Sequence, residues 1–290
     1  MTRTLFHPSI IIFAILTACL GFAQQIWGAE PDNFEEDPYV LLCGQADKAI
    51  ADGNFEEAAA RLIDAMSVKP DSPSNVLLLS NLGMIYSTLD RDSLALATID
   101  EVLRREPKMT TAHSNRARIL LKMGRDKEAF DAFGTVIGSD SLNLDARYYH
   151  GMMALYTGQL DKAEADFKVL RSLAPETAET AAALSALYSM TGRDREAIPY
   201  FKSLISFDPA AEYYAGLAGC YLATGDLSEA GATIADGLKA YPNDPELYYY
   251  RAWLNRERLL YDDARADGQK AISLGASPRR VEALFQKKVQ

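Results

Sequence analysis

The chain has 290 residues, of which 48% are hydrophobic and 24% are charged, and its formal net charge is −10. Binding to a nucleic-acid backbone needs a basic stripe of lysine and arginine, and the sequence has none outside its last segment. The composition therefore argues against a nucleic-acid partner and favours basic or neutral partners.

The first 23 residues have the layout of an export signal. Arg3 supplies a positive flank, and Ile10–Ala18 is an apolar run too short to span a bilayer comfortably. We expect cleavage after Ala23, which completes a small-x-small pattern, so that residues 1–23 form a signal peptide. The residues Leu-Thr-Ala before Cys19 also resemble a bacterial lipobox, in which Cys19 would be lipidated and begin the mature chain. An uncleaved anchor is the third alternative, and all three export the protein from the cytoplasm.

An acidic segment follows, over residues 24–38. Its second part, Glu30–Pro38, holds five carboxylates and two prolines around the single aromatic residue Phe34. A segment of this composition cannot bury enough apolar surface to fold by itself. We therefore expect an extended, solvated tether that leads to a first helix at Tyr39.

From Tyr39 onward one pattern recurs seven times. Its anchor is an alanine near the start of a second helix, at successive intervals of 37, 34, 34, 34, 33 and 34 residues. The anchors are Ala58, Ala95, Ala129, Ala163, Ala197, Ala230 and Ala264. A small residue lies twelve positions before each anchor: Ala46, Gly83, Ala117, Gly151, Ser185, Ala218 and Ala252. Small residues on two facing helices let the helices approach closely, so each copy predicts a helical hairpin.

Two further positions recur in most copies. A large apolar residue lies four positions after the anchor, at Leu62, Ile99, Phe133, Phe167, Phe201 and Ile234. A proline lies twelve positions after the anchor, at Pro70, Pro107, Pro175, Pro209 and Pro242. Proline ends a helix because it has no amide proton to donate and because the residue before it avoids helical geometry.

A period of about 34 residues with this layout is typical of tetratricopeptide repeats. On these positions the chain resembles the tetratricopeptide-repeat family over residues 39–276. The resemblance implies an all-α fold, an α-solenoid of about seven helix-turn-helix repeats. The tryptophan of the family's first helix is absent, and Gly268 replaces the large apolar residue of the last copy. Residues 277–290 are expected to form a C-terminal capping helix, because a repeat array needs an end with one polar side.

The sequence offers little chemistry beyond the repeats. Without the signal peptide only His113 and His150 remain, and no Cys, Asp or Glu stands at metal-ligand spacing around either. Cys43 and Cys220 lie in repeats too far apart for a disulfide, which needs α-carbons within about 7 Å, so we expect both to be buried. Carboxylates gather at the start of second helices, where they oppose the helix dipole. We therefore predict a protein that is not an enzyme and that holds no cofactor and no metal.

The remaining candidate is a surface. In the family, the first helices line a concave groove on the face turned away from the second helices, and rigid aromatic or methionine side chains there can capture a peptide or a helix. The positions on that face give the candidate peptide-binding residues Met84, Arg118, Tyr148, Met152, Tyr156, Met190, Tyr249, Trp253 and Arg256. Small residues such as Ala186 and Gly219 lie between the aromatic groups and would leave room for a ligand. Ordinary packing between repeats is the alternative for Tyr148, Tyr249 and Trp253.

These observations predict a non-enzymatic scaffold or adaptor of the cell envelope that binds another polypeptide in its concave groove. The alternative is a lipid-anchored assembly factor for outer-membrane or pilus components, with Cys19 as its lipidated residue. We expect a periplasmic or envelope-associated protein, or an outer-membrane lipoprotein in the alternative, with no small-molecule substrate and with membrane contact only through a lipid anchor. A self-associating structural protein and an enzyme concealed in the array are less favoured. Clamping of an acidic chaperone C-terminus is disfavoured, because the basic residues that this role needs are missing from the groove face.

Overall fold

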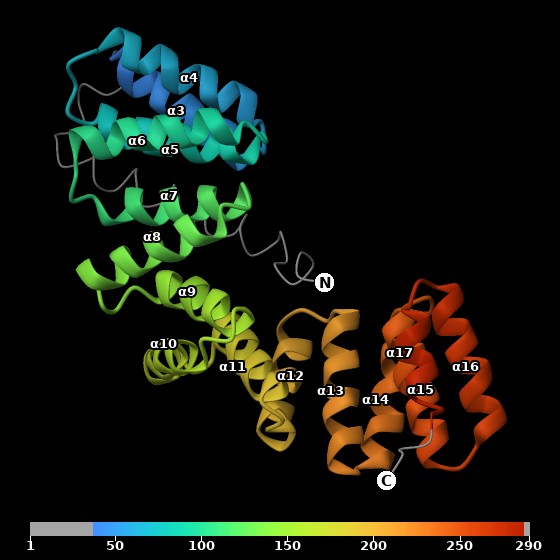
Figure 1. The fold of residues 1–290 in the computed structure, drawn as a ribbon. Helices are drawn as coiled ribbons and strands as arrows, with labels where there is room; N and C mark the ends of the chain where they lie inside the picture. Colours follow the sequence, from blue (N-terminus) through green and yellow to red (C-terminus); the bar gives the residue numbers. More distant parts are fainter. Residues whose placement is uncertain (1–36, 287–290) are drawn as a thin grey trace. The chain divides into compact units, whose positions relative to one another are not determined.

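The computed structural model describes residues 37–286, and within this range the chain forms helices and no strand (Figure 1). The predicted signal peptide, Cys19 and all but the last two residues of the predicted tether lie outside the described residues. The chain divides into two compact units, one that ends at Ala146 and one that begins at Arg147, and each is described by itself.

The first unit consists of three helical hairpins and the start of a further helix. Its helices are α3 (Pro38–Ala51), α4 (Phe55–Val68), α5 (Asn75–Thr88), α6 (Asp92–Arg105), α7 (Thr110–Lys122) and α8 (Asp126–Ser139), followed by the first residues of α9 (Leu144–Tyr156). Helix α3 begins one residue earlier than expected. The side chain of Asp37 caps it by accepting a 3.0 Å hydrogen bond from the amide of Tyr39, and the same carboxylate pairs with Lys69 at the end of the hairpin.

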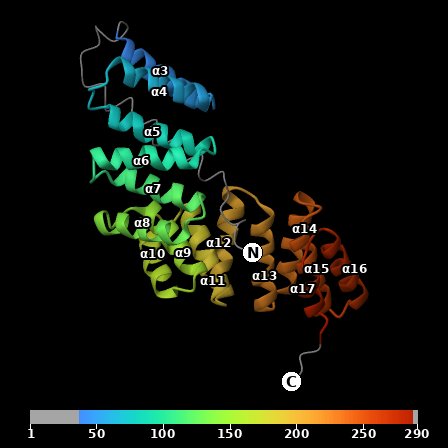
Figure 2. The ribbon, with the colours of Figure 1, turned by 45° about the horizontal axis from the view of Figure 1, so that its top comes forward.

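The second unit continues the same arrangement. It holds the rest of α9, then α10 (Leu160–Leu173), α11 (Ala178–Met190), α12 (Asp194–Phe207), α13 (Ala211–Thr224), α14 (Leu227–Ala240), α15 (Pro245–Glu257), α16 (Tyr261–Ser273) and the short α17 (Pro278–Ala283). Figures 1 and 2 both show consecutive helices of each unit packed side by side. The predicted fold class, stacked helix-turn-helix repeats with a capping helix, is confirmed.

The core of each hairpin is built on the two recurring small positions. All seven anchor alanines have no exposed surface, and the seven small residues of the first helices are also buried. In the fourth hairpin, a β-carbon added at Gly151 would lie 2.5 Å from the ring of Phe167, so a glycine is what lets α9 and α10 come this close. The pattern in the sequence is therefore a pattern of helix-to-helix contact.

The turns between the two helices also follow one rule. The residue five positions before each anchor has a positive φ in all seven hairpins, and in five of them it is glycine, which carries no Cβ penalty there. Asp90 takes this place in the second hairpin with φ 58°, and Leu259 takes it in the seventh with φ 63°. A leucine in this conformation costs about 1–2 kcal/mol, so the last turn is strained.

The last hairpin is completed by α17. Gly268 provides no side chain at the position where other repeats carry a large apolar residue, and a β-carbon there would lie 2.8 Å from Cγ1 of Val281. Val281 and Leu284 are both buried against the hairpin. The cap therefore fills with its own side chains the space that Gly268 leaves, and residues 287–290 of the predicted capping segment lie outside the described part.

Between residues 37 and 286, no helix combines the length and the apolar character that crossing a membrane requires.

Candidate interaction surfaces

The first candidate surface is the first-helix face, by which we mean the side of the first helices that carries the nine predicted groove residues. On α9, Tyr148 and Met152 are buried, and Tyr148 is only 5% exposed. Tyr148 packs edge-on against Tyr149 with ring centroids 5.2 Å apart, and burial raises the pKa of its phenol. Tyr156 lies at the end of the same helix and is partly exposed, although burial still raises its pKa.

The aromatic group of α15 is engaged by the cap. The guanidinium of Arg280 lies 3.9 Å from the ring centroid of the buried Tyr249, which is cation–π geometry. The Nη1 of Arg256 donates a 2.7 Å hydrogen bond to the backbone carbonyl of Leu284. Trp253 is partly exposed, and its indole N–H donates a 3.0 Å hydrogen bond to Glu257. Arg256 and Tyr249 therefore hold the end of the array together.

The two candidates of the first unit are also in intrachain contacts. Met84 is buried in the core around α5 and α6. Arg118 on α7 forms a two-pronged ion pair with Asp145, with distances of 3.1 Å from Nε and 2.5 Å from Nη2 to the two carboxylate oxygens. Such a pair fixes the guanidinium in one orientation and connects α7 with the start of α9.

The space between the aromatic groups is partly filled from within. A β-carbon at Gly219 would lie 3.0 Å from Cε1 of Tyr250, so the glycine on α13 receives the ring of the neighbouring α15. The expectation that Gly219 leaves room for a ligand is wrong, because Tyr250 of the next repeat fills that space. Of the nine candidates, Met190 is the most accessible at 54% exposure, and Tyr156 and Trp253 are partly accessible.

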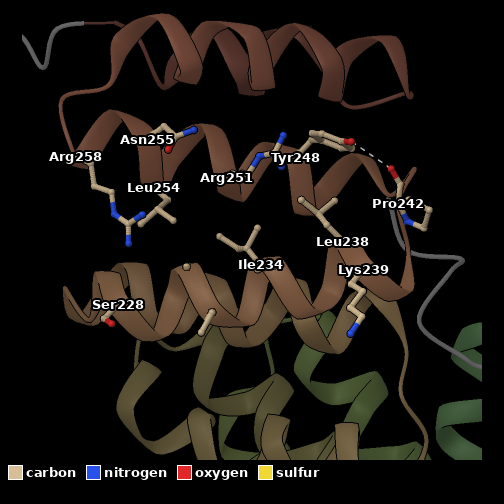
Figure 3. A pocket seen from close by; sticks show the side chains of 13 residues that line it. Ser228, Ile234, Leu238, Lys239, Pro242, Tyr248, Arg251, Leu254, Asn255 and Arg258 are labelled. Carbon is tan, nitrogen blue, oxygen red and sulfur yellow. Dashed lines mark hydrogen bonds between the residues drawn. The ribbon is translucent and has the colours of Figure 1, made fainter.

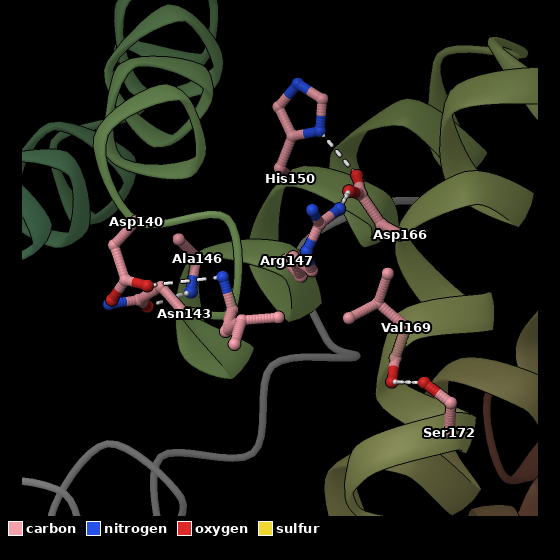
Figure 4. A network of polar contacts seen from close by, with 9 residues as sticks. Asp140, Asn143, Ala146, Arg147, His150, Asp166, Val169 and Ser172 are labelled. Carbon is pink, nitrogen blue, oxygen red and sulfur yellow. Dashed lines mark hydrogen bonds and ion pairs between the residues drawn. The ribbon is translucent and has the colours of Figure 1, made fainter.

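A buried charge cluster between α9 and α10 was not predicted from the sequence. Asp166 is 4% exposed and accepts a 2.8 Å hydrogen bond from Arg147, and its other carboxylate oxygen lies 2.6 Å from Nδ1 of His150 (Figure 4). A buried carboxylate needs such partners because its desolvation is costly. The cluster ties the two helices of the fourth hairpin together.

The same arrangement recurs in the seventh hairpin. There Asp267 binds Arg251 at 2.5 and 2.9 Å and also accepts a 2.9 Å hydrogen bond from Asn255. Both aspartates lie three positions after their anchor alanine, and His150 and Arg251 both precede the small residue of the first helix. The two hairpins therefore share an aspartate at one repeat position and a basic residue at another, and a position-by-position comparison of the repeats could have found this pattern in the sequence.

Both described cysteines are buried free thiols, as expected, and burial raises the pKa of Cys43 to about 11 and of Cys220 to about 12. Across residues 37–286, no group of three or more His, Cys, Asp or Glu side chains is arranged to hold a metal ion. The burial of the two cysteines gives them a packing role.

A second surface lies between α14 and α15, and we call it the α14–α15 crevice (Figure 3). Its volume is about 610 Å³. Apolar side chains, among them Leu238 and Leu254, share it with Lys239, Arg251 and Arg258. This crevice was not predicted from the sequence, because its lining residues come from two consecutive repeats and show nothing unusual within either repeat.

Stacked helical hairpins that meet at small residues define a helical-repeat protein. Residues 195–254 match the family model described as tetratricopeptide repeat. The structure resembles a tetratricopeptide-repeat protein from Parabacteroides merdae, with 24% identity, a TM-score of 0.60, and 86% of this chain and 97% of that one covered. It also resembles PilW, a type IV pilus biogenesis factor, with 20% identity, a TM-score of 0.62, and 72% and 96% covered. The chain therefore has the fold of tetratricopeptide-repeat proteins, and part of it matches the family's repeat model.

A curated relative is similar in sequence over a shorter stretch. The DnaJ homolog subfamily C member 7 homolog of Dictyostelium discoideum is 26% identical over an alignment of 203 residues, and the match covers 64% of this chain. The chain spans 38% of the length of that relative. Proteins built from these repeats generally mediate protein–protein interactions and act as non-enzymatic scaffolds.

Proposed function

We propose that the protein is a non-enzymatic scaffold of the cell envelope that binds another polypeptide along the first-helix face of its second unit. The observation that carries the proposal is the presence on this face of the exposed Met190 and the partly exposed Tyr156 and Trp253. Aromatic and methionine side chains on a rigid surface are frequent anchors for peptides, because they bury much apolar area at little conformational cost. Neither a small-molecule substrate nor a nucleic acid is part of this proposal.

The buried candidates have an indirect part in it. Tyr148 and Met152 are buried on α9, and their packing fixes the helix that presents Tyr156 at its end. Tyr249 and Arg256 hold the cap beside Trp253 through Arg280 and the carbonyl of Leu284. A preformed surface of this kind loses little entropy on binding.

Site-specific photo-crosslinking tests the proposed surface. A photoreactive p-benzoylphenylalanine replaces Met190 in cells that express the protein, and the matched control carries it at Leu173, which is exposed on the second helix α10. We expect a discrete adduct from position 190 that weakens when Tyr156 and Trp253 are changed to Ala. Equal adducts from both positions, or none from position 190, would contradict binding on this face.

The proposed envelope location is supported by the predicted signal peptide and not by the fold. Arg3 and the apolar run Ile10–Ala18 support export. The lipobox at Cys19 supports the alternative function, a lipid-anchored assembly factor for outer-membrane or pilus components. The likeness to PilW, at 20% identity, concerns the fold alone.

Mass spectrometry of the mature N-terminus distinguishes these two forms. A terminus at Gln24 supports a soluble periplasmic scaffold, and a tri-acylated Cys19 supports the anchored assembly factor. An intact Met1 in fractionated cells, with the protein in the cytoplasmic fraction, would remove the envelope from the proposal and leave the binding face untouched.

A further inference from the structure

The α14–α15 crevice lies on the opposite side of α15 from the first-helix face. Tyr248, Arg251, Asn255 and Arg258 follow the spacing i, i+3, i+7 and i+10 and all line the crevice. At 100° per residue their mean direction is about 150° from that of Tyr249, Trp253 and Arg256. A ligand in the crevice would therefore be independent of a ligand on the first-helix face.

The crevice is positively charged in an acidic protein. Lys239, Arg251 and Arg258 line it, and no carboxylate is among its lining residues. Asp267 neutralises Arg251 from the neighbouring helix α16. Lys239 and Arg258 form no ion pair within the described residues 37–286. Two uncompensated cations thus lie beside one apolar wall, in a chain whose net charge is −10.

Arg258 is held in place across α14 at a cost to that helix. Its Nη2 donates a 2.9 Å hydrogen bond to the carbonyl of Leu227. A β-carbon at Gly231, in the first half of α14, would lie 3.0 Å from the same nitrogen. Glycine at an interior helix position is less stable than alanine. Gly231 thus gives up helix stability and leaves room for the guanidinium.

An exposed apolar turn adjoins the crevice. Leu259, Leu260 and Tyr261 follow Arg258 directly, and Leu259 is 68% exposed at the turn position where five other hairpins have glycine. A strained backbone that keeps a large apolar side chain exposed to water does not stabilise the fold. Burial of that side chain by a partner would stabilise a complex.

We propose that the α14–α15 crevice binds a short acidic segment of a partner protein, whose carboxylates pair with Lys239 and Arg258 and whose apolar side chains contact Leu238 and the Leu259–Tyr261 turn. Carboxylates suit a guanidinium because the pair forms two parallel hydrogen bonds. The volume of about 610 Å³ is within the range of about 300–1,000 Å³ that is typical of ligand sites.

A polyphosphate or an anionic membrane fits less well. The exposed carboxylates of Glu257, Asp262 and Asp263 flank the apolar turn and would repel a continuous anionic surface. The net charge of the protein would also repel a polyanion at long range. A short segment with few carboxylates, which meet the two cations, is repelled much less in both ways.

A phage library of random dodecapeptides, selected on the full chain, is the probe. We expect enrichment of peptides that combine several carboxylates with at least one large apolar residue. The enriched peptides should bind Arg258→Glu at least about tenfold more weakly, since a charge-assisted hydrogen bond is lost and a repulsion is gained. Arg195→Glu is the matched control, because it makes the same charge change at an exposed position of α12, and it should change the affinity less than about twofold.

Gly231→Ala separates binding from folding. The added methyl group displaces the end of a flexible arginine and removes a helix glycine, so thermal stability should stay equal or rise while peptide affinity falls. A complete absence of acidic peptides from the enriched set, equal losses in Arg258→Glu and Arg195→Glu, or unchanged affinity in Gly231→Ala would overturn the proposal. So would tighter binding of phosphatidylglycerol vesicles than of the selected peptides through the same residues. Crosslinks at Met190 are unaffected by any of these results, so the two proposed surfaces fail or survive separately.

Discussion

The contact between Gly151 and Phe167 supports a quantitative test of how the hairpins are held together. A methyl group at position 151 would lie 2.5 and 2.9 Å from two carbons of the fully buried Phe167 ring, well inside the usual contact distance of about 3.5–4.0 Å. Overpacking of this kind costs about 1–3 kcal/mol. Alanine in place of a helix glycine gains about 1 kcal/mol. We therefore expect Gly151→Ala to lower the free energy of unfolding by up to about 2 kcal/mol.

Gly44→Ala is the matched control for this experiment. Gly44 is also inside a first helix, α3, but it is exposed, and a β-carbon there would meet no atom within 4 Å. This variant should gain about 1 kcal/mol, so the two substitutions should differ by the overpacking term of about 1–3 kcal/mol. Urea unfolding followed by circular dichroism measures both. Hydrogen exchange of the α9 and α10 amides localises the loss, because repeat arrays can unfold in parts.

A second substitution identifies the cause. Phe167→Leu should cost less in the Gly151→Ala background than in the unchanged protein, because the smaller side chain removes the clash. If Gly151→Ala proves as stabilising as Gly44→Ala, the close approach of α9 and α10 does not depend on glycine. The interpretation of the twelve-residue spacing as helix contact would then be refuted.

Three other predictions follow from burial and backbone strain. Asp166→Ala should lower the free energy of unfolding in urea by about 3 kcal/mol, because it removes the carboxylate from a buried ion pair. The control Asp100→Ala breaks the exposed pair with Arg116 and should lower it by less than about 1 kcal/mol. Equal losses would contradict a buried role for Asp166. Leu259→Gly should raise the thermal midpoint by relieving the positive φ, and Asp90→Gly should not, because aspartate tolerates that region and Asp90 also pairs with Lys122. In a Cys43→Ala chain that starts at Gln24, Cys220 is the single thiol, and its pKa of about 12 leaves only about one thiol in 10⁴ ionised at pH 8. Ellman's reagent should therefore react with the folded protein far more slowly than with the protein in urea, and the rate for the folded protein should rise with pH. Equal rates in the folded protein and in urea would contradict burial.

Most of the fold could be predicted because its information is local and repeated. Each hairpin has the same pair of small residues at the same spacing, so seven weak indications of helix contact together give one strong prediction. The structure places every anchor alanine and every small partner inside a hairpin. The turn rule was not predicted, although Gly53, Gly124 and their counterparts carry it, because a single glycine between two helices is compatible with several turn conformations.

The surfaces could be predicted only as directions on a helix. The repeat register places Tyr148 and Tyr249 on the first-helix face, but how much of each ring remains accessible depends on the neighbouring helices and on the cap. Arg280, for example, comes from a segment with no counterpart in the repeats. The crevice was not predicted for a related reason. Gly231 and Arg258 belong to different hairpins, and their contact forms only when α14 and α15 pack together.

The departure of the last repeat from the family pattern has a physical reason that a comparison of repeats alone would misjudge. Judged by its own hairpin, Gly268 is a loss of packing. In the structure, Val281 enters the space above it, Leu284 is buried beside it, and Arg256 binds the carbonyl of Leu284. A large side chain at position 268 would improve the hairpin and exclude the segment that covers its outer side. The last hairpin packs against a capping helix and not against another repeat. The position that carries a large apolar side chain inside the array is therefore glycine at its end, because that glycine leaves space for the cap.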